Sequence, residues 1–252
     1  GYKQQEKKRL SKRTRVSLFL LLVAIPLTIA AGFWLTDQSA LADWIDRVFG
    51  PRKYYLISLV IVLYALLPFF MAFEGRKPEV RELVVLATMI ALATAGRAAF
   101  FMTPSFKPII AIVIISAIAF GAEAGFLVGS MTMLVSNFLF GQGPWTPWQM
   151  FAMGFIGFLS GILYRLRILP TKRLQLSVYG FLVTFMIYGG IMNPAALFMS
   201  VYQFSWSGLL AIYISGVPVD LVHASSTFLF LWIGAKPLLE KLQRIKVKYG
   251  LL

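Results

Sequence analysis

The feature that most constrains the fold of this chain is a series of long stretches without a charged residue. Two such stretches are residues 16–36 and 54–73. Two longer ones are residues 124–164, with 41 uncharged residues, and residues 174–219, with 46. A helix needs about 20 mostly apolar residues to cross the hydrocarbon core of a membrane. The chain is therefore predicted to be an all-α integral membrane protein, because helices satisfy their own backbone hydrogen bonds in lipid.

The composition agrees with this class. Of the 252 residues, 59% are hydrophobic and 13% are charged, whereas a soluble domain has about 25% charged residues. These values exclude an ordinary soluble enzyme, a disordered chain and a disulfide-linked secreted domain. The chain has no cysteine and a single histidine, His223, so thiolate catalysis and a multi-histidine metal site are excluded, and we expect no metal and no cofactor of its own.

About eight membrane-spanning helices are predicted. Turn-forming residues divide the two longest stretches at 141–148 and at Asn193-Pro194,. The segment 195–216 is ambiguous, since it fits a long outer loop, a re-entrant helix or a lid. We expect two extra helices in 1–78, a six-helix substrate-binding core in 79–236 and a basic cytoplasmic tail in 237–252. The predicted spans are 16–36, 54–73, 83–102, 108–122, 124–140, 148–164, 174–192 and 217–235.

The distribution of lysine and arginine predicts the orientation. With the N-terminus in the cytoplasm, 19 of the 24 basic residues fall on the cytoplasmic side and four outside, and Arg97 lies within a helix. This asymmetry follows the positive-inside rule. We expect a multi-pass protein of a bacterial cell membrane with both termini in the cytoplasm. The net charge of +14 is assigned to orientation in the lipid bilayer and not to binding of nucleic acid.

The sequence contains no P-loop motif for nucleotide binding,. Acidic residues are scarce in the predicted spans, whereas ion-coupled carriers usually contain several ionisable groups there. If the protein moves a solute against its gradient, a partner is expected to supply the energy. Two alternatives from other classes stay open: a membrane enzyme acting on lipid, with Asp220, His223 and Arg97 as catalytic residues, and a purely structural membrane subunit.

A stripe of alanines follows one side of the third predicted helix. Residues spaced by four lie above one another on a helix surface, and small side chains let a second membrane helix approach closely. This stripe indicates either packing within the chain or docking of another membrane subunit. Its members are Ala87, Ala91, Ala95 and Ala99. Two glycine groups, at 125–129 and 154–161, indicate packing within the chain.

Polar and aromatic residues gather near the predicted outer ends of the helices, where they could bind a ligand. Asp220 and His223 share one side of the last helix and form either a structural pair or ligand contacts. Arg97 is expected to pair with Asp220, to bind an anionic ligand group or to reach the membrane surface. The candidate substrate-binding residues are Arg97, Asn137, Trp145, Trp148, Gln149, Tyr188, Asn193, Tyr202, Trp206, Asp220 and His223.

Over residues 79–236 the chain resembles the substrate-binding S components of energy-coupling factor (ECF) vitamin transporters. The resemblance rests on the alanine stripe, on Ser136-Asn137-Phe138, on the block Gly143-Pro144-Trp145-Thr146-Pro147-Trp148-Gln149-Met150 and on Pro218-Val219-Asp220-Leu221-Val222-His223-Ala224. Among the S components, the sequence most resembles those assigned to cobalamin (vitamin B12). The two N-terminal helices depart from the six-helix pattern of most members.

The resemblance implies a transport subunit and not an enzyme. Such a subunit captures a vitamin in an outward cavity capped by three loops, here 103–107, 141–147 and 193–216. It then docks through the alanine stripe on a membrane-embedded T component. Two ATPase subunits supply the energy by hydrolysing ATP. We expect cobalamin or a related corrinoid as the substrate, because a neutral cavity rich in rings and amides suits a large amide-rimmed ligand. Riboflavin, pantothenate and a queuosine precursor are the alternatives.

Overall fold

The computed structural model describes residues 19, 47, 53–74, 79–200 and 205–250. Every regular element in this part of the chain is helical. The elements are α4 (Lys53–Glu74), α5 (Val80–Ala99), α6 (Ile109–Phe120), α7 (Ala122–Phe140), α8 (Thr146–Arg165), α9 (Arg173–Val183), the π-helical turn η3 (Thr184–Tyr188), α10 (Gly189–Ser200) and α11 (Trp206–Tyr249). The predicted span at 16–36 lies outside the described residues, as does almost all of the basic N-terminal segment.

The prediction of an all-α, multi-pass membrane protein is confirmed. Within the described residues, five helical segments are long and apolar enough to cross a membrane: α5, α7, α8, the continuous run Arg173–Ser200 and α11. The extra helix α4 adds 22 residues of similarly apolar sequence. In contrast, α6 has only 12 residues and is about 18 Å long, which is too short to span the membrane alone.

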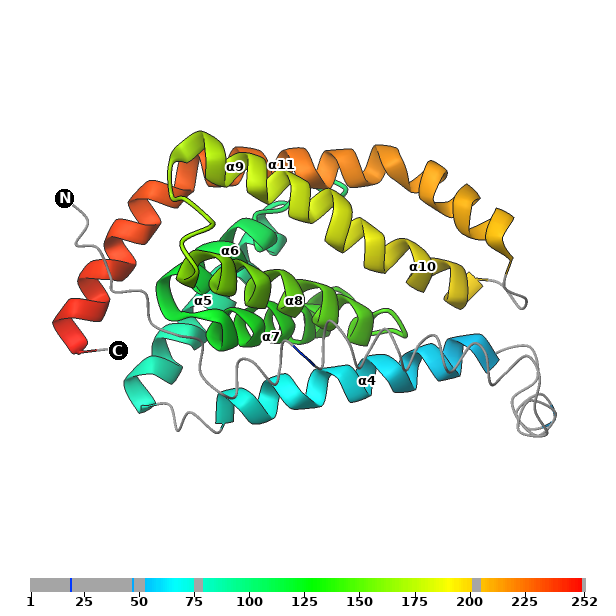
Figure 1. The fold of residues 1–252 in the computed structure, drawn as a ribbon, viewed down its shortest axis with the longest axis horizontal. Coiled ribbons are helices and arrows are strands. Elements are labelled where there is room, and N and C mark those ends of the chain that lie inside the picture. Colours follow the sequence, from blue (N-terminus) through cyan, green and yellow to red (C-terminus); the bar gives the residue numbers. More distant parts are fainter. Residues whose placement is uncertain (1–18, 20–46, 48–52, 75–78, 201–204, 251–252) are drawn as a thin grey trace.

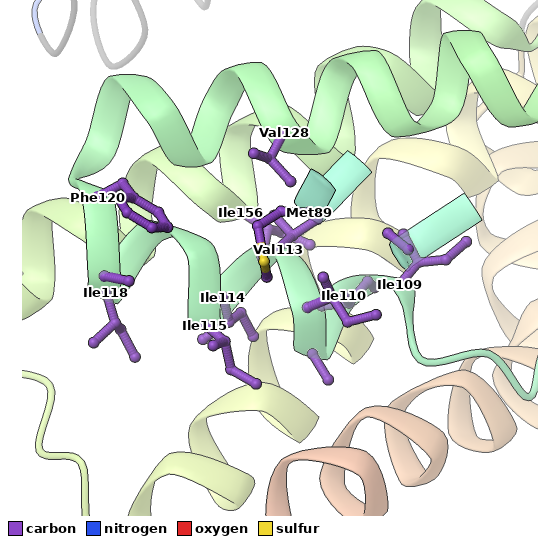
Figure 2. Packing of buried hydrophobic residues seen from close by; sticks show 14 of the residues in the cluster. Met89, Ile109, Ile110, Val113, Ile114, Ile115, Ile118, Phe120, Val128 and Ile156 are labelled. Atoms are coloured by element: carbon purple, nitrogen blue, oxygen red, sulfur yellow. The ribbon is translucent and has the colours of Figure 1, made fainter. Parts of the chain in front are cut away.

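The short helix α6 is the centre of the bundle. All 12 of its residues are buried, and it contacts α5, α7, α8, α9 and α11. Figure 2 shows Ile114, Ile115 and Ile118 directed to one side of α6, while Val113 lies on the other side near Met89. A helix that is apolar on every side is stable only when it is enclosed, so the isoleucine-rich sequence explains the central position.

The helices surround α6 in two groups (Figure 1). The run from α9 to α10 and the long α11 lie along one side, and α4, α7 and α8 lie along the other. The closest pair is α7 and α8, because glycines form their seam. A Cβ atom on Gly129 would overlap with the backbone of Met153, and one on Gly157 would overlap with the backbone of Gly125. The prediction that these glycines serve packing within the chain is confirmed.

The predicted break at Asn193-Pro194 is wrong, because α9, η3 and α10 form one continuous helical run to Ser200. Proline lacks the N–H that would bond to the carbonyl four residues earlier. That carbonyl belongs to Gly190, and it instead accepts a hydrogen bond of 2.8 Å from the hydroxyl of Tyr213 on α11. A side chain from a distant segment thus replaces the missing backbone donor, so the helix continues.

The long loop predicted at 195–216 is also wrong, since residues 195–200 end α10 and residues 206–216 begin α11. The alternatives of a re-entrant helix and of a lid stay predictions. Helix α11 has 44 residues and contains Pro218 and Pro237. It begins at Ser205, whose hydroxyl accepts a hydrogen bond of 3.1 Å from the backbone N–H of Gly208, a typical N-cap. Figure 1 shows α11 following α9 and α10 and then bending towards its C-terminal end. The outer connection is therefore much shorter than predicted.

Candidate substrate-binding site

The candidate site is built around Arg97, near the end of α5. Its Nη1 atom donates hydrogen bonds to the hydroxyl of Ser136 at 2.6 Å and to Oδ1 of Asn137 at 2.7 Å, both on α7. The guanidinium carbon also lies 5.0 Å from the centre of the Phe140 ring, within the range of a cation–π interaction. Arg97 therefore joins α5 to α7 through neutral groups, and its charge is not opposed by a carboxylate among these contacts.

Asn137 is the centre of the polar network. Its side chain is fully buried, so its amide must find partners within the protein. The Oδ1 atom accepts from Arg97, while Nδ2 donates to Thr146 Oγ1 at 3.0 Å and to Gln149 Oε1 at 2.8 Å. One amide thus connects α5, α7 and the first turn of α8. This geometry explains why a polar residue is stable in an otherwise apolar helix.

The turn between α7 and α8 is held in one shape by the same network. Thr146 donates to Gln142 Oε1 at 2.9 Å, and Gln142 Nε2 donates to the carbonyl of Leu134 at 2.9 Å. Gly141 has a φ of 109°, a conformation that favours glycine. The indole of Trp145 packs over Gly143 and is 40% exposed. The turn is shorter than predicted, because α8 already begins at Thr146.

Tyr188 and His223 form the second part of the site. Their rings meet edge to face, with centroids 4.7 Å apart, and His223 is buried. Tyr188 ends the π-helical turn η3, and such turns often occur at functional sites. Gln149 and Arg97 are among the groups that interact with Tyr188. Tyr188 therefore connects the aromatic pair to the Asn137 network.

A polar clasp joins α10 to α11 on the outer side of Tyr188. Asn193 Nδ2 donates to Asp220 Oδ2 at 2.7 Å. Glycines make room for both side chains, because a Cβ atom on Gly189 would overlap with Asp220 and one on Gly216 would overlap with Asn193. Asp220 therefore accepts a hydrogen bond from an amide, not from His223 or Arg97, and the clasp holds the two helices together.

The connection between α5 and α6 is fixed to α11 through Lys107. The backbone N–H of Lys107 donates to Ser226 Oγ at 2.8 Å, and that hydroxyl donates to the Lys107 carbonyl at 2.8 Å. The ammonium group of Lys107 donates to the carbonyls of Phe100 and Thr103. Burial, with a smaller contribution from Arg97, lowers the pKa of Lys107. This loop therefore closes the same end of the bundle as the Asn137 network.

Trp148 lies beside this network in an apolar environment. It forms a buried cluster with Val62 and Ala195, and its ring centroid is 6.3 Å from that of Phe198. Its indole Nε1 is buried and has no hydrogen-bond partner within the described part of the chain. Leaving a buried donor unpaired costs about 1–3 kcal/mol, so this N–H is a group that an acceptor on a ligand would stabilise.

The structure therefore brings together eight of the eleven predicted binding residues. Trp145 and Trp206 lie at the ends of helices and are exposed, Trp206 by 78%, and Tyr202 lies outside the described residues. The eight are Arg97, Asn137, Trp148, Gln149, Tyr188, Asn193, Asp220 and His223. They do not combine as the enzyme alternative would need, since Arg97 contacts Ser136 and Asn137 while Asp220 contacts Asn193.

Sequence reasoning missed Ser136, Thr146, Lys107 and Ser226 as members of this region. Each is a single hydroxyl or ammonium group without a recognisable motif, although Ser136 and Thr146 lie inside the quoted blocks. A different space, a cavity of about 420 Å³ between α9 and α11, is lined by Val178, Phe181, Ser225 and Phe228. It contains none of the residues of the polar network.

All four members of the alanine stripe are exposed, whereas the opposite face of α5 is buried through Leu86, Met89 and Ala93. The stripe is therefore not used for packing against the described helices. Exposed small residues on a membrane helix favour contact with another helix. Among the described residues, the stripe is therefore open to contact with another helix.

The chain matches the family model described as ECF-type riboflavin transporter, S component, over residues 77–244. This segment contains the polar network and the alanine stripe but not α4. No curated protein and no solved structure gives a significant match. Because the family match covers more than half of the chain, the protein belongs to this family. It is a substrate-specific membrane subunit of an ECF-type vitamin transporter and not an enzyme. The match names riboflavin and does not support the expectation of cobalamin.

Proposed function

We propose that this protein is the riboflavin-specific S component of an ECF transporter, and that it captures riboflavin from outside the cell. The family match is the observation that carries the proposal. Riboflavin has a flat isoalloxazine ring with imide donors and acceptors, and a ribityl chain of hydroxyl groups. Such a ligand needs ring contacts and neutral hydrogen-bonding groups, which are the groups that the site provides.

The candidate contacts fall into two kinds. Trp148, Tyr188 and His223 offer aromatic surfaces for the isoalloxazine ring, and the unpaired indole N–H of Trp148 offers a donor. The amides and charged groups of the network offer hydrogen bonds to the imide and to the ribityl hydroxyls. These are Arg97, Asn137, Gln149, Asn193 and Asp220. The exposed positions of Trp145 and Trp206 suit residues that meet the ligand at entry.

The direct test is binding of riboflavin to the purified full chain, measured by quenching of flavin fluorescence. We expect saturable quenching of riboflavin fluorescence, and we expect that an excess of pantothenate, cobalamin or a queuosine precursor does not displace the bound riboflavin. Tight binding of cobalamin without binding of riboflavin would restore the cobalamin assignment. Mass spectrometry of small molecules that co-purify from cells gives an independent answer, with riboflavin as the expected species.

The exposed alanine stripe supports docking on a T component, with two ATPase subunits that hydrolyse ATP. A bulky side chain on this face should block docking without changing the site. Ala91→Trp and Ala95→Trp are therefore expected to abolish riboflavin uptake in cells that contain the coupling subunits and to leave binding unchanged. Leu92→Trp is the matched control, because Leu92 is also exposed on α5 but lies off the stripe. Equal loss of binding in the stripe variants would contradict docking.

The orientation is part of the proposal. Both termini are placed in the cytoplasm of a bacterial cell, because the basic residues concentrate on that side. The loop at Lys107 and the turn at 141–145 would then face outward. Accessibility of single cysteines to a membrane-impermeant reagent tests this directly, since the natural chain has no cysteine. We expect labelling of Gln142→Cys in whole cells and no labelling of Lys248→Cys.

A further inference from the structure

Helix α4 lies outside the segment that matches the family, which begins at residue 77. Even so, it packs along the core on one continuous face. Its buried residues recur at helical spacing and are Val62, Ala65, Leu66, Phe69 and Phe73. Residues on other sides of the helix are exposed, among them Val60, Leu63, Leu67 and Met71. The helix is therefore fitted to the core through a specific face and is not a loosely associated anchor.

Aromatic contacts fix the C-terminal half of α4. The Phe69 ring stacks on Phe126 of α7 with centroids 4.1 Å apart and meets Phe158 of α8 edge to face at 4.9 Å. Phe126 in turn lies against Gly154, where a Cβ atom would overlap with the ring. Aromatic pairs of this kind have preferred geometries, so the position of α4 relative to α7 and α8 is well defined.

Near its middle, at Val62, helix α4 reaches the candidate site. Val62 is 4% exposed and belongs to the same buried cluster as Trp148 of α8 and Ala195 of α10. Helix α4 thus contacts both α8 and α10. Gln149, the next residue after Trp148, belongs to the Asn137 network. The Val62 side chain therefore packs in the cluster that surrounds Trp148, whose buried indole N–H has no partner among the described residues.

From this arrangement we propose that α4 is part of the wall of the substrate site and that Val62 sets the space available beside Trp148. The inference rests on the proposed riboflavin function and adds a specificity-determining residue from outside the matched segment. Val62 acts by limiting where the indole lies. A larger residue at position 62 moves the ring towards the ligand, and a smaller one lets it move away.

The experiment compares binding of riboflavin and of lumiflavin, a smaller flavin without the ribityl chain, to the purified full chain. In Val62→Trp we expect riboflavin affinity to fall at least tenfold and the ratio of the two affinities to change at least fivefold. Val62→Ile, which adds a single methylene group, should change the ratio in the same direction by about twofold. Leu63→Trp is the matched control, because Leu63 is adjacent but 47% exposed, and it should leave the ratio unchanged.

The outcomes separate this inference from the proposed function. If the wild-type chain does not bind riboflavin, the proposed function and the inference that rests on it are both overturned. If the wild type binds riboflavin but the Val62 and Leu63 variants have the same affinity ratio, only the inference is overturned. A Val62 variant that loses thermal stability and weakens both flavins equally also overturns it, because packing alone would then account for the effect.

Discussion

Two neighbouring helix pairs of this protein are joined in opposite ways. Helices α7 and α8 meet backbone to backbone at Gly129 and Gly157, where no side chain fits. Helices α10 and α11 are joined by polar side chains, through Asn193 with Asp220 and through Tyr213 with a carbonyl. A seam without side chains has one geometry, whereas a polar contact can be exchanged for a contact with a ligand. The first pair therefore fixes the shape of the bundle and the second adjoins the candidate site.

The largest expected effect is at the glycine seam. Gly157→Ala places a methyl group against the backbone of Gly125, and overpacking of this kind costs about 3 kcal/mol. The free energy of unfolding in mixed micelles measures it. Gly234→Ala is the control, since a Cβ atom there meets open space, and alanine in a helix is favoured by about 0.5–1 kcal/mol. Equal stability of the two variants would show that the seam is not rigid.

The next largest effect is at the Asn137 network, which joins the α7 and α8 pair to α5. Asn137→Leu removes one acceptor of Arg97 and the amide donor to Thr146 and Gln149, so we expect a loss of about 2–3 kcal/mol in stability. Riboflavin affinity should fall at least tenfold in the same variant. Ser136→Ala is the comparison, because it removes only one of the two acceptors of Arg97. A Ser136 variant as defective as the Asn137 variant would contradict the central role of the amide.

The clasp between α10 and α11 should be weaker. Asn193→Leu removes the donor to Asp220 and is expected to cost about 1–2 kcal/mol. In the double variant with Asp220→Leu, much of this cost should disappear, because neither polar partner remains. The free energy of unfolding of both single variants and the double variant gives the interaction. Strict additivity would show that the two side chains do not stabilise each other.

The smallest effect is at the carbonyl that Pro194 leaves free. Tyr213→Phe removes its hydrogen bond and should cost about 1 kcal/mol. In a Pro194→Ala background, the restored backbone N–H can donate to Gly190, so the same change should cost close to nothing. The measurement is the change in the free energy of unfolding caused by Tyr213→Phe, once in the wild-type chain and once in the Pro194→Ala chain. An equal cost in both backgrounds would mean that the hydroxyl does not replace the missing donor.

The difference between the two helix pairs also explains which features could be predicted from the sequence. The glycines of α7 and α8, and the long apolar runs, are local signals, and the packing and helices that they predict are present. The alanine stripe is also a local signal that the sequence shows, and its exposure among the described helices favours docking of another helix. The block that begins at Gly143 identified part of the site, because Thr146, Trp148 and Gln149 are held together by one turn and one helix start.

The predictions that are wrong concern contacts between segments that are distant in the sequence. Proline normally indicates the end of a helix, but Pro194 is tolerated because Tyr213, 19 residues further on, satisfies the carbonyl of Gly190. The same continuity removed the loop predicted at 195–216. The pairing of Arg97 with Ser136 and Asn137, and of Lys107 with Ser226, depends on how helices align in space. No spacing in the sequence indicates these contacts.

The length of α11 has a mechanical consequence. The helix contains His223 at the candidate site, and further along it Lys246 donates to the carbonyl of Ala119 at the opposite end of α6. The 23 residues between these positions span about 35 Å. Pro237 lies between the two positions, so the helix bends within this length. Helix α11 thus links the candidate site to the far end of α6 through one unbroken helix, and both ends of the bundle share a single structural element.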